Sequence, residues 1–113
     1  MKISWTGSTA IVEHGYPVFI VKGGSIVVQP LLENHFLATP SRRMLIRLAM
    51  GVGIQVQIKK LTMDDIRRAD EVLYVDREEN ITPVLEVDDT PIWDGKIGVV
   101  TTILINRKYK GKL

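Results

Sequence analysis

Two short and almost continuously apolar segments, 18–21 and 25–28, flank the pair Gly23-Gly24. Segments rich in β-branched residues on either side of a Gly-Gly turn predict a β-hairpin. Neither segment alternates with polar residues, so both faces of these strands are expected to be covered. This is the clearest hairpin in the chain, and it predicts a sheet whose strands are covered on both faces.

The rest of the chain mixes helical and strand patterns. A helix is expected after Thr39 as N-cap and Pro40 as first helical residue, and it should end near Gly51. Thr62 predicts the start of a short second helix. Further strands are expected at 10–12, 54–58, 72–75 and 81–87, a turn at 88–90, and a last helix at 99–106. The pattern predicts one α/β or α+β domain over residues 1–113, with a mixed sheet, two or three short helices, a loose start at 1–8 and a frayed basic tail at 107–113.

Composition excludes several classes of protein. The 113 residues carry a formal net charge of +2 and no cysteine. A small, interspersed charge does not favour nucleic acid, and the lack of cysteine excludes disulfides and thiolate metal sites. No apolar run approaches the roughly 20 residues of a membrane span, and the start lacks a signal-peptide pattern. A cytoplasmic protein with neither nucleic acid nor membrane as partner is expected.

Few residues outside the helix starts suggest chemistry. His14 and His35 are too few and too far apart to predict a metal site. Trp5 and Trp93 are interpreted as core or interface residues. The start of the first long helix is the best candidate for an anion site, because unpaired N–H groups there would be joined by the hydroxyl of Ser41 and the charge of Arg42. A plain, well-capped surface helix is the alternative interpretation.

One part of the sequence resembles a known family. Residues 69–72 read Ala-Asp-Glu-Val, residues 81–84 read Ile-Thr-Pro-Val, and residues 94–98 read Asp-Gly-Lys-Ile-Gly, followed by Thr101 and Thr102. This series resembles the C-terminal domain of the class IV pyridoxal-phosphate aminotransferases, which include branched-chain and D-amino-acid aminotransferases and aminodeoxychorismate lyase. The resemblance covers about residues 18–102. Its motifs are turns and strands more than chemistry, so it implies the fold more strongly than the activity.

The resemblance also implies positions for cofactor binding. In the family, a Gly-Ile-Thr-Arg sequence at the helix start holds the cofactor phosphate. Here Leu37 and Arg42 match the pattern, Ser41 replaces threonine, and Pro40 replaces isoleucine and removes one N–H. A second, hydroxyl-rich phosphate turn of the family corresponds to residues 76–80, which here carry carboxylates that would repel phosphate.

Two further positions concern the ring of the cofactor and its attachment. Glu13 corresponds to the family's glutamate at the pyridine nitrogen if one residue is deleted, whereas an ungapped comparison places Val12 there. The family's Schiff-base lysine precedes that glutamate on a segment outside these 113 residues, and Lys2 lies too close to replace it.

Three functions remain open at this point. The first is a truncated, degenerate aminotransferase-like domain without transaminase activity of its own, for which pyridoxal phosphate is a possible but non-covalent ligand. The second is one half of a split aminotransferase whose lysine-bearing half is another chain. The third is a small module that binds a phosphate or carboxylate ligand at Ser41 and Arg42. An apolar face supplied by residues 18–28 is expected to contact a second copy or the missing domain.

Overall fold

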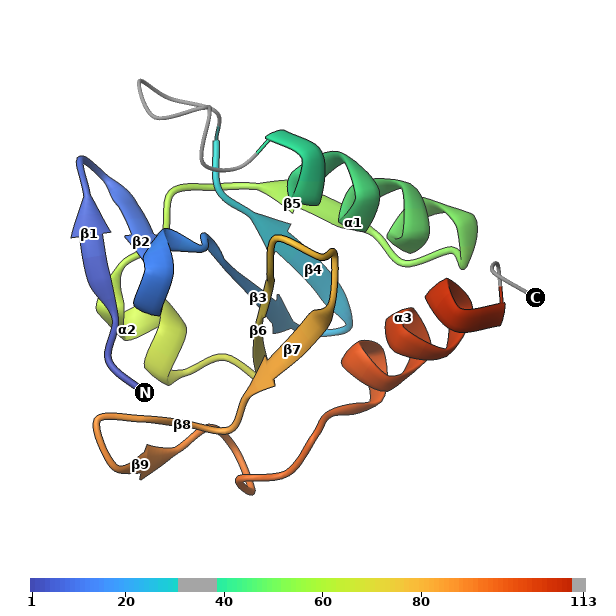
Figure 1. Ribbon diagram of the computed structural model, residues 1–113. Coiled ribbons are helices and arrows are strands. Elements are labelled where there is room, and N and C mark those ends of the chain that lie inside the picture. The colour runs from blue at the N-terminus through green and yellow to red at the C-terminus, as the bar shows by residue number, and fades with distance from the viewer. Residues whose placement is uncertain (31–38, 111–113) are drawn as a thin grey trace.

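A computed structural model describes residues 1–30 and 39–110, without the side chains of Thr39 and Pro40. Its centre is a five-stranded mixed sheet in the order β5-β4-β3-β6-β7 (Figure 1). The β4–β5 pair is parallel and the other three pairs are antiparallel. The strands are β3 (Val18–Lys22), β4 (Ser25–Val28), β5 (Val56–Ile58), β6 (Glu71–Val75) and β7 (Ile81–Val84). This architecture confirms the predicted mixed α/β class.

The predicted hairpin lies in the middle of the sheet. Strands β3 and β4 pair with Ile20 opposite Val27, and every residue of both strands except Lys22 is buried. Gly23 and Gly24 have φ values of +58° and +80°, as a two-residue turn of this twist requires. The expectation that both faces are covered is confirmed.

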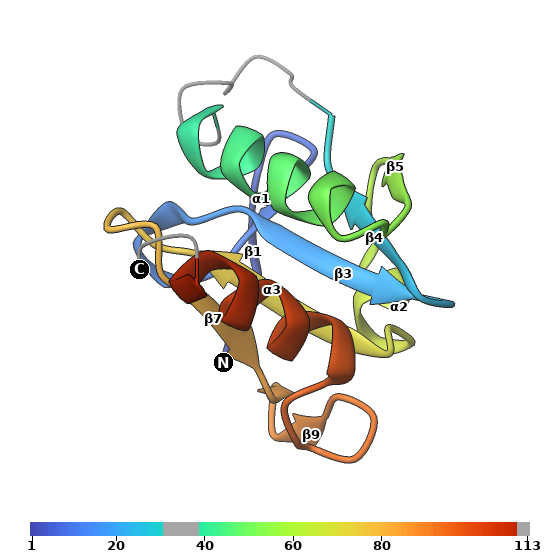
Figure 2. The ribbon, with the colours of Figure 1, turned by 90° about the vertical axis from the view of Figure 1, so that its right-hand side faces the viewer.

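Two helices cover one face of the sheet, as Figure 2 shows. They are α1 (Thr39–Gly51) and α3 (Val99–Lys110). Leu45 and Ala49 of α1 and Leu104 of α3 form one core with Phe19 and Leu73 of the sheet. The β-branched and aromatic side chains of the central strands thus meet the apolar stripes of both helices.

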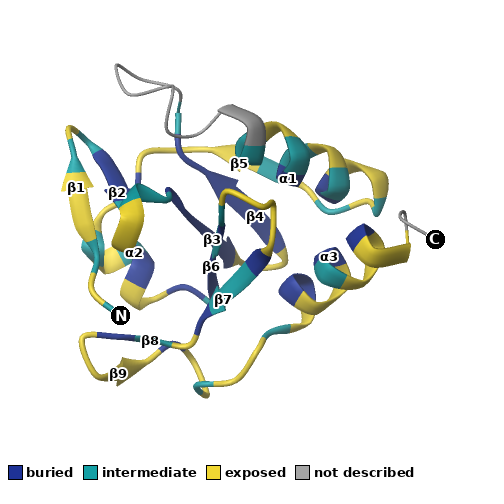
Figure 3. Cartoon of the chain, viewed as in Figure 1, coloured by how far each residue is buried: buried dark blue, intermediate teal, exposed yellow. Residues whose placement is uncertain are grey.

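The opposite face carries a second core, and the burial colours of Figure 3 show the sheet enclosed between the two layers. Here α2 (Met63–Arg67) contributes Ile66, and β2 (Thr9–Ile11) contributes Ala10. They pack with Val18 and Ile20, whose side chains alternate along β3 with those of the first core. Residues 18–28 therefore do not supply an exposed apolar face, and the prediction that a partner covers them is wrong, because their own chain covers both sides.

Both chain ends are more ordered than expected. The start, predicted to be loose, contains β1 (Ser4–Thr6), which pairs with β2 around Gly7. In the tail predicted to fray at 107–113, α3 continues to Lys110, and the Nζ of the buried Lys108 donates to the Glu79 carbonyl, whereas residues 111–113 lie outside the described residues. Both segments are ordered by tertiary contacts, and such contacts cannot be predicted from the neighbouring residues in the sequence.

Two other predictions also need correction. The strand expected at 81–87 divides into β7 and β8 (Glu86–Val87), and β8 forms a hairpin with β9 (Thr90–Pro91). The positive φ values of Asp88 and Asp89 make the tight turn of this hairpin. Of the two alternatives for Trp5 and Trp93, the core is wrong, since they are 41% and 73% exposed, and the interface stays a prediction.

Within the described ranges, no helix combines the length and apolarity needed to cross a membrane. The same ranges contain no group of three or more histidine and acidic side chains that could hold a metal ion.

The buried carboxylate of Glu71, the first residue of β6, joins the sheet to α3. Its two oxygens accept the N–H groups of Val100 at 3.0 Å and Thr101 at 2.8 Å. A carboxylate at this position accepts hydrogen bonds from two helical N–H groups that have no partner within the helix. Its negative charge also interacts favourably with the positive end of the helix dipole. Gly98 makes the approach possible, because a Cβ atom there would lie 2.1 Å from the Glu71 Cδ atom.

We predict that Gly98→Ala lowers the free energy of unfolding by about 2 kcal/mol or more, because the added methyl displaces Glu71 and leaves buried N–H groups unsatisfied. Gly51→Ala is the matched control, since a Cβ atom at Gly51 meets nothing within 4 Å. Urea unfolding of both variants measures the difference. Equal stability of the two variants would contradict the proposed role of the glycine.

The short helix α2 starts with the predicted cap. The Thr62 hydroxyl accepts the N–H of Asp65 at 3.0 Å, and the Asp65 carboxylate accepts the N–H of Thr62 at 2.9 Å. The Thr62 backbone N–H and, to a smaller extent, Lys59 hold the pKa of Asp65 below its ordinary value, against the opposing effect of partial burial.

A lowered folded-state pKa means that this contribution to stability is present above the ordinary aspartate pKa of about 3.9 and is lost as the pH falls through the folded-state value. We therefore expect Asp65→Asn to flatten the loss of stability on acidification from about pH 5 to about pH 2. Thermal unfolding at a series of pH values measures this slope. Asp64→Asn, outside the capping box, is the control, and an Asp65→Asn profile that stays parallel to the wild-type profile would refute the assignment.

Candidate functional site

The helix start predicted to bind an anion is the N-terminal turn of α1. The helix begins at Thr39, one residue before Pro40, which was the expected first residue. The side chains of Thr39 and Pro40 lie outside the described part of the structure. Ser41 and Arg42 are half-buried in the first turn. Leu37, the other residue matched to the family's phosphate sequence, lies outside the described residues.

The Arg42 side chain forms a hydrogen bond to the residue that follows β4. Its Nε donates to the carbonyl of Gln29 at 3.1 Å. The buried side chain of Gln29 in turn accepts the N–H of Ala10 and donates to the carbonyls of Ala10 and Val18. A chain of hydrogen bonds thus ties the start of α1 to the end of β4 and to β2. Sequence reasoning assigned the Arg42 charge to a ligand and gave no role to Gln29.

The turn at 76–80, implied as the second phosphate contact, folds around Asp76. Its Oδ1 atom accepts the N–H groups of Glu78 at 3.0 Å and Asn80 at 2.8 Å, and its Oδ2 atom accepts the Asn80 side-chain amide at 3.1 Å. Glu79 adopts a φ of +64°. These hydrogen bonds take up backbone N–H groups that a phosphate would otherwise contact.

The same hydrogen bonds fix a negative charge in the turn. Partial burial raises the pKa of Asp76, but the hydrogen bonds from Asn80 and Glu78, together with the nearby Lys108 ammonium, outweigh burial and lower it overall. Asp76 is therefore ionised at neutral pH. The Asp76 carboxylate would therefore repel a phosphate at this turn, as expected from the sequence.

The fold brings the turn and α1 together at a cavity of about 450 Å³. Its walls come from the second turn of α1 and from Glu79, whereas Ser41 and Arg42 do not line it. Two arginines at i and i+4, Arg43 and Arg47, line the cavity together with Glu79. The helical spacing of these arginines was visible in the sequence, but the cavity that they share with Glu79 was not.

Glu13, the candidate partner for a pyridine nitrogen, lies in a 3₁₀ turn, η1 (Glu13–Gly15), and is exposed. Its ungapped alternative, Val12, is buried in the core. Within the described ranges no hydrogen bond or ion pair involves the Glu13 side chain. The cofactor role of Glu13 stays a prediction.

Two parts of the implied phosphate site already form hydrogen bonds within the protein. The Arg42 Nε donates to the Gln29 carbonyl, and the Asp76 carboxylate accepts the N–H groups of Glu78 and Asn80. A phosphate dianion at the turn 76–80 would have to displace the bonds to Asp76 or lie against carboxylates.

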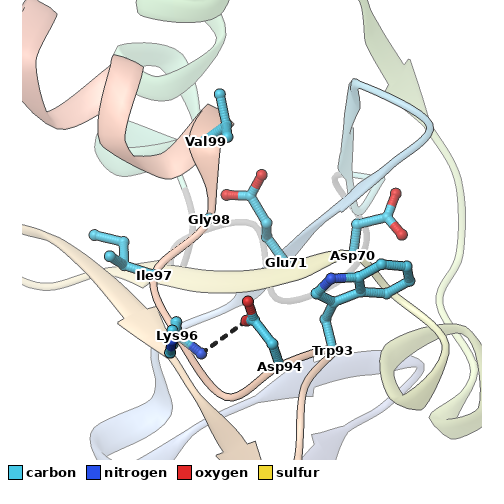
Figure 4. Close-up of a pocket in the computed structure, with 8 residues that line it drawn as sticks. All are labelled: Asp70, Glu71, Trp93, Asp94, Lys96, Ile97, Gly98 and Val99. Atoms are coloured by element: carbon cyan, nitrogen blue, oxygen red, sulfur yellow. Dashed lines mark hydrogen bonds between the residues drawn. The ribbon is translucent and has the colours of Figure 1, made fainter.

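A second pocket, of about 390 Å³, lies at the start of α3 (Figure 4). Glu71, the first residue of β6, and Asp70 before it form one side of the pocket lining. The rest of the lining includes Trp93, Asp94, Lys96, Ile97 and Val99. Asp70 is bonded elsewhere, since its Oδ2 accepts the N–H of Gly23 at 2.8 Å. The sequence indicated the turn but not the pocket, because the pocket forms only where the turn meets β6.

Comparison with known proteins identifies the relatives of the chain. No family model matches it. It is 29% identical over 99 residues to a D-alanine aminotransferase of Staphylococcus aureus, covering 88% of this chain and 35% of the relative. It is 33% identical over 96 residues to a putative branched-chain-amino-acid aminotransferase of Methanocaldococcus jannaschii, covering 85% of this chain and 33% of the relative.

Solved structures agree with the sequence relatives. The branched-chain amino acid aminotransferase from Escherichia coli matches with a TM-score of 0.74 and 28% identity, over 91% of this chain and 37% of that one. The branched-chain aminotransferase of Thermoproteus uzoniensis matches with a TM-score of 0.77 and 27% identity, over 94% of this chain and 35% of that one. The chain thus spans about a third of the length of its relatives.

Sequence and fold together confirm the resemblance to the class IV aminotransferases. Most of the chain is related to D-alanine and branched-chain aminotransferases, and it corresponds to about one third of their length.

Proposed function

We propose that these 113 residues form a degenerate aminotransferase class IV-like domain that does not catalyse transamination by itself. The observation that carries the proposal is the carboxylate-rich turn at 76–80, where Asp76 accepts the N–H groups of Glu78 and Asn80 that a phosphate would otherwise contact. Arg42, at the start of α1, donates its Nε to the Gln29 carbonyl.

The lysines of the described chain support the same proposal. When bound, pyridoxal phosphate supplies an electron sink, and the protein must hold a lysine against it for transfer of the amino group. The residues lining the α1 cavity include no lysine. Lys59 pairs with Asp65, and the Lys108 ammonium donates to the Glu79 carbonyl, so both of these lysines already have partners.

A second candidate function is one half of a split aminotransferase. The observation in its favour is that the chain corresponds to only about a third of its relatives, so a lysine-bearing domain on a separate chain would restore a whole enzyme. A third candidate is a small anion-binding module. The arginines Arg43 and Arg47 favour it more than Ser41 and Arg42 do, because they line the cavity. Each of these functions is compatible with a cytoplasmic protein, which we also propose.

Titration with pyridoxal phosphate, borohydride trapping and peptide mass mapping test the leading proposal. We expect slow, unsaturable labelling spread over exposed lysines such as Lys60 and Lys96, as for ordinary surface amines. Saturable labelling of one lysine at one equivalent would overturn the proposal. The label on a peptide that contains Lys96 alone would further place the site at the second pocket.

An activity assay separates the leading proposal from the split enzyme. We expect no transamination of D-alanine or of a branched-chain amino acid by the chain alone with added pyridoxal phosphate. Activity that appears only on mixing with a lysine-bearing aminotransferase domain would establish the split enzyme. Activity of the chain alone would refute the degenerate-domain proposal.

We predict that Arg42→Gln lowers the free energy of unfolding by roughly 1 kcal/mol, because it removes the charged donor to the Gln29 carbonyl. Arg43→Gln is the matched control on the exposed side of the same turn and should change stability by less than about 0.5 kcal/mol. Urea unfolding measures both values. If phosphate binding is detected by calorimetry and Arg42→Gln abolishes it at unchanged stability, Arg42 serves a ligand and the structural role is wrong.

A further inference from the structure

The turn between β6 and β7 directs several N–H groups at one carboxylate. Asp76 Oδ1 accepts the N–H of Glu78 at 3.0 Å and the N–H of Asn80 at 2.8 Å. Its Oδ2 atom accepts the side-chain amide of Asn80 at 3.1 Å. N–H groups that converge in a turn form a concave site for an anion, and phosphate is a typical occupant of such sites. In this chain, the anion in the concavity is part of the turn itself.

Backbone hydrogen bonds also hold the shape of this turn. The N–H of Asp76 donates to the Asn80 carbonyl at 3.1 Å, and the N–H of Glu79 donates to the Asp76 carbonyl at 3.0 Å. Glu79 has a φ of +64°, in the left-handed region that turns successive N–H groups to one side. The strands continue from the turn as a pair, with Val75 opposite Ile81. The concavity is therefore expected to persist without the Asp76 side chain.

Positively charged side chains lie near the turn, and they come from both helices on this face of the sheet. The buried ammonium of Lys108, from α3, donates to the Glu79 carbonyl and interacts electrostatically with the Asp76 carboxylate. Arg43 and Arg47, from α1, line a cavity together with Glu79. A buried ammonium is stabilised by a nearby negative charge, because burial disfavours its charged form. Asp76 supplies that charge from within the chain, and a bound anion would serve the same purpose.

The turn carries three carboxylates, which differ in what they contact. Glu78 and Glu79 are exposed, and among the described residues no hydrogen bond or ion pair involves their side chains. Salt screens the charge of exposed groups over a distance of about 8 Å at physiological ionic strength. The hydrogen bonds of Asp76 block the N–H groups at any salt concentration. Asp76 therefore has a stronger effect on an anion at this turn than the total charge of the turn.

We propose that Asp76 is a built-in anion, whose carboxylate occupies an oxyanion site formed by the turn at 76–80, and that the site binds phosphate once this carboxylate is removed. The proposal rests on the proposed function, since both concern this turn, and it identifies the one side chain that closes the site. A phosphate group, free or part of a larger molecule, suits the site because its oxygens accept several N–H groups at once.

Titration of Asp76→Gly with inorganic phosphate, at constant pH and ionic strength, tests the proposal. We expect saturable shifts of the backbone amide NMR signals of Glu78 and Asn80, with a dissociation constant in the millimolar range. A titration to roughly 100 mM covers this range. The wild-type chain should show no such shifts. Unchanged signals in Asp76→Gly overturn the proposal, and so do saturable shifts of the same two signals in the wild type.

Two control variants separate occupation of the site from its charge. Asp76→Asn keeps an acceptor oxygen at the same place but loses the negative charge, so the N–H groups should stay occupied and phosphate should not bind. Glu78→Gln removes one charge from the same turn and leaves the Asp76 hydrogen bonds in place, so it should not bind phosphate either. If either control binds phosphate as tightly as Asp76→Gly, charge alone closes the site and the proposal is wrong.

Thermal unfolding extends the test to a variant that loses stability. A ligand that binds only the folded state stabilises it, so phosphate at about ten times its dissociation constant should raise the unfolding temperature of Asp76→Gly by about 5 °C more than that of the wild type. The wild type measures the general effect of phosphate on folded proteins. Asp76→Ala, which keeps the Cβ atom, is a second variant and should respond in the same way. Equal increases for the wild type and both variants overturn the proposal.

Failure of this proposal and failure of the proposed function give different results. If Asp76→Gly does not respond to phosphate and the wild-type chain has no transaminase activity, only the built-in anion is refuted. If phosphate binds to the turn of the wild type, the built-in anion is refuted and the proposed function loses the observation that carries it. Transamination by the wild-type chain alone refutes the proposed function, whatever the phosphate titration of Asp76→Gly shows.

Discussion

The position of α3 depends on the buried carboxylate of Glu71. The side chain leaves the first residue of β6 and ends on the N–H groups of Val100 and Thr101, so one residue sets both the edge of the strand and the start of the helix. Gly98 leaves the space for this approach. With α3 fixed, Leu104 closes one core, Lys108 reaches the turn at 76–80, and the turn before the helix forms the wall of a pocket. Three separate features thus follow from one capping interaction.

The site between α1 and the turn at 76–80 is the basis of the proposed function. The helix and the turn lie together at one cavity, as the likeness to the aminotransferases implies. Two of the groups implied to lie near a ligand form hydrogen bonds within the protein, the Arg42 Nε with Gln29 and the Asp76 carboxylate with its own turn. This is the physical basis of the proposal that the domain is degenerate.

Most of the elements could be predicted from the sequence. The Gly23-Gly24 hairpin, the helix that ends near Gly51, and the Thr62 cap each depend on residues adjacent in the chain. The failures have a common cause. The paired start at Ser4–Thr6 and the ordered end of α3 depend on partners distant in sequence, and the exposure of Trp93 depends on the positive φ imposed by its turn. Composition alone assigned that tryptophan to a core or an interface.

The sequence by itself determined the class of fold, because strand and helix periodicities, caps and turn glycines are local properties of the chain. It also contained the family resemblance, in motifs that specify strands and turns. Only the tertiary structure decided which side chains share a site. Arg42 and Arg43 are neighbours in sequence, yet one bonds to the Gln29 carbonyl and the other lines the cavity with Glu79. Successive helical residues point about 100° apart, so the burial of one face assigns adjacent charges to different surroundings.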